Sequence, residues 1–131
     1  MSFQSALYTW LTEQSGITAI VSSSIYPLAI EQGTGILPAV RYEILGEDRD
    51  NTFDGQGNFV GADVQIDSVA TTHAAAVALA EAIKSSLLNY SGLMGTLEVD
   101  RVYLEAVGDF YEEQLKAYRC SQSWTIWHYE A

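Results

Sequence analysis

Two histidines and one cysteine are the side chains of this sequence best suited to bind a metal ion or to relay protons. They are His73, His128 and Cys120. Metal and catalytic sites built from such residues use short, fixed spacings such as HxxxH or paired Cys and His, and no such spacing occurs here. We therefore expect surface or capping roles for both histidines. Cys120 is expected to be a small apolar filler of a strand, because no neighbouring sequence favours its thiolate.

Serine, glycine and acidic residues also form no recognisable catalytic motif. The nucleophile pattern GxSxG is missing, and the glycines of GEDRDNTFDGQG do not lie between a strand and a helix, as a phosphate-binding loop requires. The acidic residues of this segment, Glu47, Asp48, Asp50 and Asp54, lack the order of a calcium loop. The sequence therefore predicts no enzyme active site, no metal and no cofactor.

Charge is the strongest feature of the composition. The formal net charge is −11, from 17 acidic and 6 basic residues. Binding to phosphates needs clustered Lys and Arg, so specific nucleic-acid binding is not expected. Composition alone favours solubility as the role of this charge. A second interpretation is that an acidic surface suits a conduit through which DNA passes without sticking.

Length and composition favour one globular domain over residues 1–131. The chain is 48% hydrophobic and 18% charged, and its single cysteine excludes an internal disulfide. No apolar run approaches the ~20 residues that span a bilayer, and the start, MSFQSALYTW, lacks the features of a signal peptide. We expect a protein that is made and used inside a cell, away from membranes.

Helical periodicity occurs in two main segments. Residues 2–14 carry an apolar stripe behind the N-cap Ser2, and Gly16 is expected to end this helix before a short helical turn at residues 17–21. Thr71 or Thr72 caps the second helix, residues 73–90, whose alanine-rich wall predicts close packing on a sheet.

Strand character appears between and after these helices. A brief edge strand is expected at residues 25–27, then an exposed loop at 28–37 and a half-buried strand from Pro38. Residues 46–58 are predicted to form a long turn, and the returning strand should place Asp63 and Asp67 on its outer side.

The last third predicts two more strands. One covers residues 96–107 with a bulge near Asp100 and Arg101, and a turn follows at 108–113 before the final alternating strand. The predicted fold is α+β: a mostly antiparallel sheet of four to five strands with two main helices packed on one face.

Aromatic residues concentrate in this same third. They include Tyr103, Phe110, Tyr111, Tyr118, Trp124, Trp127 and Tyr129. One small core face does not obviously absorb so many, and Trp127 has a parity opposite to that of Trp124. Two interpretations stay open: some of these rings lie at a protein interface, or loops cover the second face.

Several stretches in order resemble the tail completion family of long-tailed bacteriophages, also called tail terminator or tail-to-head joining proteins. The stretches are SALYTWL, GITAIV leading into SIYPL, LPAVRYEIL, a DGQG turn, GADVQIDSVA before an alanine-rich helix, and VGDFYEEQLKAYRCSQSWTIWH. This resemblance covers almost the whole chain. It implies an α+β subunit of a ring, commonly hexameric, at the head-proximal end of the tail of a virion assembled in the host cytoplasm. It brings no catalytic residues.

A structural role in a phage tail is thus the leading hypothesis. The tail tube protein and head connector proteins are the expected partners, and copies of the chain are expected to hide the sheet margins of their neighbours. The candidate contact residues lie on the two predicted turns and on the last strand: Arg49, Phe53, Asp54, Asp109, Phe110, Tyr111 and Trp127.

Two alternatives remain at this stage. One is a connector or neck protein on the head side, whose copies would also assemble into a ring. The other is a small ligand-binding or enzymatic domain that uses His73, Asp67 and Glu81 in a cleft.

Overall fold

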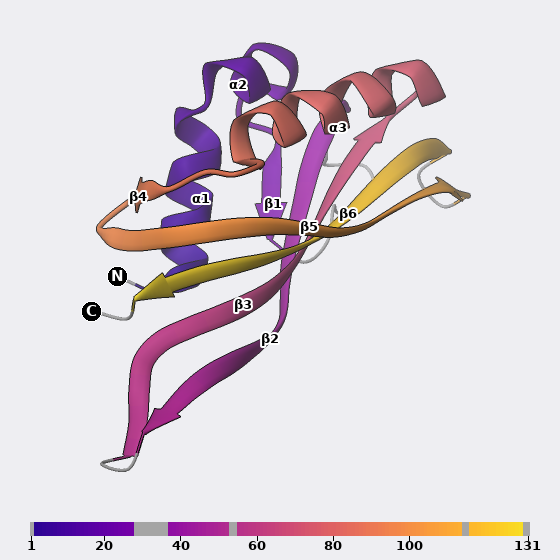
Figure 1. Cartoon of the computed structure of the whole chain (residues 1–131). Coiled ribbons are helices and arrows are strands. Elements are labelled where there is room, and N and C mark those ends of the chain that lie inside the picture. The colour runs from indigo at the N-terminus through magenta and orange to yellow at the C-terminus, as the bar shows by residue number, and fades with distance from the viewer. Residues whose placement is uncertain (1, 28–36, 53–54, 114–115, 130–131) are drawn as a thin grey trace.

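The computed structural model describes residues 2–27, 37–52, 55–113 and 116–129, without the side chains of 50–52 and 55–58. The loop predicted at residues 28–37 lies almost wholly outside this range. Within these ranges the chain forms three helices on one face of a six-stranded sheet, in the strand order β1-β2-β3-β6-β5-β4 (Figure 1). The elements are α1 (Phe3–Glu13), α2 (Ser15–Val21), β1 (Ile25–Pro27), β2 (Ala39–Thr52), β3 (Gly55–Ala70), α3 (His73–Leu87), β4 (Gly92–Met94), β5 (Leu97–Glu112) and β6 (Ala117–Tyr129).

The α+β class and the placement of helices on one face are confirmed, but the strand count is not. The sheet has six strands because the short β4, which pairs only with residues 97–99 of β5, was not predicted. The sheet is also mixed, since β1 runs parallel to β2 while the other pairs are antiparallel. A parallel pair needs a long connection to bring the chain back to the same end, and the segment between Pro27 and Ala39 supplies it.

The N-terminal helix begins as predicted and ends earlier. The hydroxyl of Ser2 accepts a hydrogen bond from the Ser5 N–H at 3.1 Å, and the apolar stripe faces the core. The break falls at Gln14, whose extended backbone separates α1 from α2. The prediction that Gly16 ends the helix is wrong, because Gly16 lies in the first turn of α2.

The third helix packs tightly on the sheet, as its alanine content predicts. Thr72 caps it, accepting a hydrogen bond from the Ala75 N–H at 3.2 Å, and Ala76 and Ala80 are buried beside Cys120. The helix stops at Leu87, three residues short of the predicted end at Tyr90. Tyr90 instead follows the helix and packs edge-on against Trp10, with ring centroids 5.3 Å apart.

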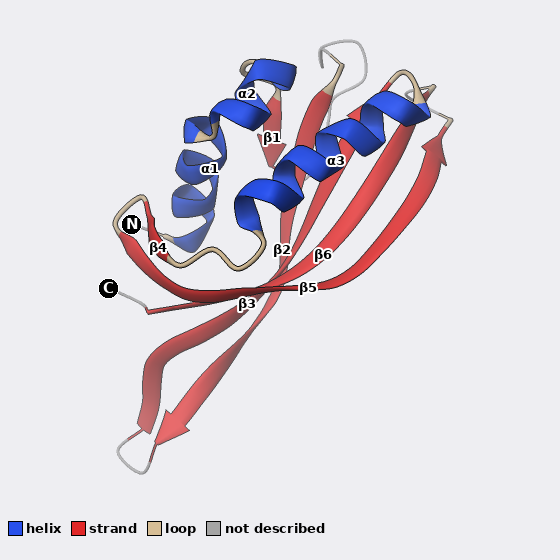
Figure 2. Ribbon diagram, turned by 45° about the horizontal axis from the view of Figure 1, so that its top comes forward, coloured by secondary structure: helices blue, strands red, loops and turns tan. Residues whose placement is uncertain are grey.

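Both predicted turns of the sheet are largely strand. The β2–β3 pairing continues through residues 46–58 to the pair Thr52 and Gly55, and the β5–β6 pairing continues to Glu112 and Ala117. Polar residues tolerate strand structure here because backbone hydrogen bonds form whatever the side chain, and register shifts at several points bend the strands. The shift between Val99 and Arg101 confirms the predicted bulge. The far end of the β2–β3 ribbon projects well away from the helices (Figure 2).

Asp67 corrects the expectation that the outer side of β3 faces solvent. Its parity is as predicted, pointing away from the helices, yet it is only 1% exposed. Arg41 Nε donates to Asp67 Oδ2 at 2.8 Å, a second guanidinium nitrogen of Arg41 pairs with the same oxygen, and Arg119 lies at 3.5 Å. Ser121 donates to Oδ1, and Arg119 also pairs with Glu112 at 2.9 Å. Long side chains from the neighbouring strands therefore cover this carboxylate.

These contacts make Asp67 the main polar tie among β2, β3, β5 and β6. We expect Asp67→Ala to lower the free energy of unfolding by about 3 kcal/mol, because two arginines lose their buried partner while keeping some contact with water. Asp63, four residues earlier on the same face of β3, is a matched control. It accepts one hydrogen bond, from Thr125 at 3.2 Å, and Asp63→Ala should cost less than about 1 kcal/mol. Urea unfolding measures both losses, and equal values for the two variants would contradict this role of Asp67.

Candidate interaction surface

The side of the sheet opposite the helices carries a shallow pocket that combines aromatic and cationic side chains. Five residues from β2, β3, β5 and β6 line it: Arg49, Phe59, Arg101, Tyr103 and Trp127. The cavity measures about 470 Å³. We call it the arginine–aromatic pocket. Two of the six basic residues of this acidic chain therefore meet at one place.

Ring stacking gives this pocket its shape. The rings of Phe59 and Trp127 stack with centroids 5.0 Å apart, and the Arg101 guanidinium lies 5.9 Å from the centre of the Phe59 ring. Trp127 lies directly over Gly61, where an added Cβ would come within 2.8 Å of the indole. Only glycine therefore lets Trp127 lie flat on β3. The predicted opposite parity of Trp124 and Trp127 is confirmed, since Trp124 is buried in the core.

The two arginines of the pocket form exposed ion pairs with nearby acids. Arg49 pairs with Glu47 at 3.0 Å and Arg101 with Asp100 at 2.9 Å. The pKa of Arg101 is raised above its ordinary value, mainly by a hydrogen bond with Tyr103. Both cations are therefore charged at neutral pH, while exposed ion pairs of this kind contribute little stability.

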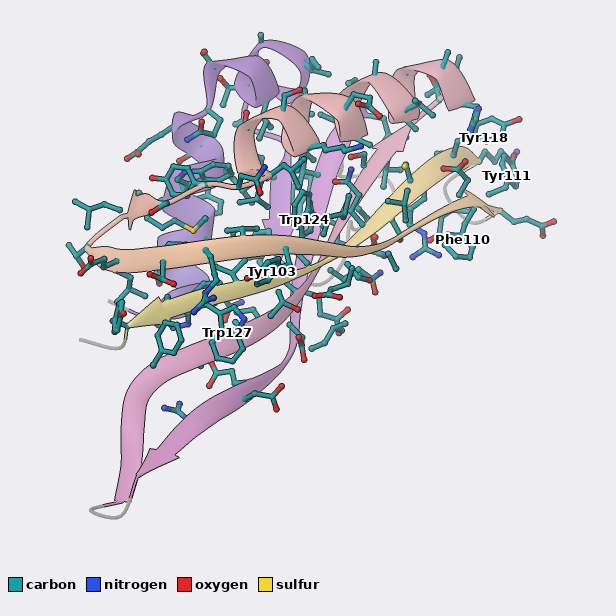
Figure 3. All side chains as sticks on the ribbon, in the orientation of Figure 1. Tyr103, Phe110, Tyr111, Tyr118, Trp124 and Trp127 are labelled. Atoms are coloured by element: carbon teal, nitrogen blue, oxygen red, sulfur yellow. The ribbon has the colours of Figure 1, made fainter. Side chains whose placement is uncertain are left out.

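A second group of exposed aromatic rings lies at the far end of the same strands. We call residues 109–113, together with Tyr118, the hairpin end. Phe110 is 51% and Tyr111 52% exposed. The Arg119 guanidinium stacks 4.5 Å above Phe110 on one side of the sheet, and Tyr111 meets Tyr118 edge-on at 5.1 Å on the other. Figure 3 shows Phe110, Tyr111 and Tyr118 together, well separated from Tyr103 and Trp127.

The hairpin end is fastened to the start of α3. His73 Nε2 lies 3.3 Å from Asp109 Oδ2, and its ring contacts Tyr118 edge-on at 5.9 Å. Hydrogen bonds from Cys120 and then from His73 lower the pKa of Asp109, so this carboxylate is ionised at neutral pH. His73 is exposed, as predicted. These exposed contacts lie between the start of α3 and the acidic and aromatic residues of the hairpin end.

The candidate contact residues thus fall into two places. Asp109, Phe110 and Tyr111 come together at the hairpin end, and Arg49 and Trp127 come together in the pocket. Phe53 and Asp54 lie outside the described residues. No sequence pattern places Phe59 or Arg101 at this surface, and Tyr103 stands out only as one of the crowded aromatic residues of the last third. The alternation of β5 indicates that Tyr103 faces away from the core, since its neighbours Val102 and Leu104 face inward. Only the pairing of β5 with β6 shows that Tyr103 lies beside Trp127 on that outer side.

The enzymatic alternative loses its proposed cleft. Asp67 is bound by Arg41 and Ser121 on the side away from the helices, whereas His73 pairs with Asp109 at the start of α3, and Glu81 is exposed on that helix. Across the described residues, no set of three or more His, Cys, Asp or Glu side chains is placed to hold a metal ion. No helix in those same ranges is both long and apolar enough to cross a bilayer.

His128 and Cys120 are both core residues. The expectation of a surface role for His128 is wrong: it is 1% exposed and stacks on Phe3 with centroids 4.5 Å apart, because its parity on β6 continues the inward series. Cys120 is a buried filler beside α3, as predicted. Burial, and then the hydrogen bond to Asp109, raise the pKa of its thiol to about 11.

This environment should make Cys120 unreactive in the folded protein. With its pKa raised from 9.0 to about 11, the thiolate fraction at pH 8 falls about 100-fold. We expect iodoacetamide to alkylate native Cys120 at least 100-fold more slowly than the urea-unfolded chain, with mass spectrometry as the readout. Rapid labelling of the native protein would contradict the described burial.

Comparison with known proteins bears on the fold and the family of this chain. The chain is similar over 98% of its length, and 96% of the other chain, to a chain in the structure titled "Virion of native gene transfer agent (GTA) particle", with a TM-score of 0.69 and 17% identity. At that identity the likeness shows a shared fold. No curated protein sequence matches the chain. The model of the family "Tail completion protein gp17" matches residues 5–129. The chain therefore belongs to the tail completion protein family and is a structural protein of a phage tail.

Proposed function

We propose that this chain assembles with copies of itself into a ring that closes the head-proximal end of the tail tube and joins the tail to the head. Its family supplies the tail location, and the resemblance noted in the sequence favours six copies. The observation that carries the ring is the pair of exposed surfaces at the two ends of β5. One surface is cationic and aromatic and the other is acidic and aromatic, so each is complementary to the other and not to itself. Repeated contacts between two unlike surfaces form a ring when the rotation from one subunit to the next adds up to a full turn.

Exposed aromatic rings support an assembly of this kind. Tyr103, Phe110 and Tyr111 are each about half exposed, at 47%, 51% and 52%, and all three lie on β5. Large aromatic side chains are enriched in protein interfaces, where burial of their apolar area stabilises the complex. Contacts within the chain leave about half of each ring in water. We therefore assign these residues to contacts with other chains.

The margins of the sheet are less suited to contact than the sequence suggests. Beyond its pairing with β4, the outer edge of β5 has no strand partner within the described residues, and neither has β2 beyond its pairing with β1. Both edges carry register shifts and acidic residues, such as Glu43 and Asp48 on β2 and Glu105 and Asp109 on β5. Bulges and like charges block edge-to-edge pairing of strands. We therefore place the contacts between subunits on side-chain surfaces.

Charge supports the path for DNA through this ring. The net charge of −11 leaves an acidic surface on each copy. A channel without clustered lysines does not trap the phosphates of a passing polymer, because trapping relies on release of condensed counterions by cations. The four arginines are paired with nearby acids, as Arg41 and Arg119 are with Asp67.

Assembly in solution is the direct test of the ring. We expect light scattering of the purified protein to give about six times the 14.4 kDa of the chain, and negatively stained particles to show a central hole. A monomer at all concentrations, or a closed dimer without a hole, would contradict the proposal.

The projecting β2–β3 ribbon is the proposed contact with the tube or the connector. Replacing residues 52–55 by Asn-Gly joins the paired residues Asn51 and Gln56 through a two-residue turn and removes the tip without altering the body. We expect this variant to fold and form rings but to lower the yield of infectious particles at least tenfold, measured by plaque assay or transfer assay. Substitution of exposed Thr12 by Ser on α1 provides a neutral control. Full infectivity and normal tail length in the ribbon variant would show that the tip makes no essential contact.

A further inference from the structure

We propose that the hairpin end of one copy docks into the arginine–aromatic pocket of the next copy, and that this contact, repeated around the ring, is the subunit interface. The inference rests on the proposed ring and names the two surfaces that meet. It commits the pocket to a second copy of this chain as its occupant.

Geometry prevents one chain from filling its own pocket. Tyr103 in the pocket and Phe110 at the hairpin end lie on the same strand, β5, and seven residues of extended chain span about 23 Å. β6 pairs with β5 along this length and holds the two surfaces apart. The side chains visible in Figure 3 show the same separation. Contact between the two surfaces therefore requires two chains, and it is heterologous, as ring closure demands.

Charge makes the two surfaces complementary. The pocket carries Arg49 and Arg101, whereas residues 109–113 include the carboxylates of Asp109, Glu112 and Glu113. Glu112 is paired with Arg119 and Asp109 with His73, but Asp109 is still half exposed and Glu113 is exposed. In a chain with only six basic residues, an acidic peptide surface finds few other places where two cations lie together. Complementary charge of this kind fixes register and disfavours wrong partners.

Shape and apolar area also agree. The pocket has walls from Phe59, Tyr103 and Trp127 and a volume of about 470 Å³, which suits a docked aromatic side chain. Phe110 and Tyr111 are the rings available at the hairpin end. Arg49 and Arg101 form exposed ion pairs with Glu47 and Asp100. Replacing these acids by carboxylates of the neighbouring copy therefore costs little free energy. Aromatic anchors inside a rim of charged pairs are the usual composition of a strong interface.

Charge reversal tests this pairing. Arg101→Glu places an acid in the pocket, and Glu113→Arg places a cation on the hairpin end; both side chains are exposed, so both variants should fold, as circular dichroism and melting would check. Each variant alone should assemble at least tenfold more weakly than the wild type by light scattering, because like charges then face each other.

Mixing the two reversed variants gives the sharpest outcome. When the two variants alternate around the ring, two kinds of contact alternate as well. One kind pairs a wild-type pocket with a wild-type hairpin end. The other pairs the acid at position 101 of the pocket with the cation at position 113 of the hairpin end. Opposite charges therefore meet at every contact, so rings should reappear with an even number of subunits. Lys84→Glu on α3 makes the same charge change away from both surfaces and should leave assembly unchanged. Tyr103→Ser, which removes a pocket wall without a charge change, should also weaken assembly.

The outcomes separate this inference from the proposed function. If the wild-type protein forms rings that Arg101→Glu and Tyr103→Ser leave intact, the pairing is wrong while the ring stands. If the wild type remains monomeric at all concentrations, both are wrong. If both pocket variants keep their rings but lose binding to purified tube protein, the pocket receives an acidic segment of that partner, and the assignment to a second copy is overturned.

Discussion

The buried carboxylate of Asp67 is the interaction on which the arrangement of the sheet depends. Among the described residues, the helices and the main apolar core cover one side of the sheet, while the other side has only a small buried cluster of Ala39, Val69 and Ala117 instead of a helical layer. Asp67 replaces that layer with ion pairs to Arg41 and Arg119 and a hydrogen bond from Ser121. A buried carboxylate is favourable only when its partners are fixed, and the pairing of the strands fixes them. The sheet can therefore keep a largely uncovered face.

This uncovered face gives the subunit two different ends. The strands that meet at Asp67 continue one way to the pocket with Arg101 and Trp127, and the other way to the hairpin end with Phe110. A rigid central tie between the ends sets the angle at which each copy presents its surfaces to its neighbours. A fixed angle of this kind is what ring closure needs, because a variable one gives open filaments or aggregates.

Much of the fold could be predicted from local patterns. Apolar spacing and capping residues predicted α1 and α3, and alternation predicted the inner parts of β3 and β6. The far ends of β2, β3 and β5 could not be recognised as strands, because their sequences have no regular alternation of apolar and polar residues. The burial of Asp67 and His128 was missed for a related reason. Parity shows which side a residue faces, but the side chains that cover it, such as Arg119 or Phe3, come from distant segments. Of the candidate surface, the aromatic residues of the last third were singled out from the sequence, whereas Phe59 and Arg101 were not, because the strand pairing that brings them together is not visible in local patterns.

The position of this protein on assembled particles tests the central claim most directly. Tails from cells that make no heads, and heads from cells that make no tails, can be separated and examined by cryo-electron microscopy with an antibody against this chain. The account predicts one ring at a single end of the free tails and no label on the free heads. Label on tailless heads together with its absence from free tails would contradict it and would identify a neck protein of the head instead.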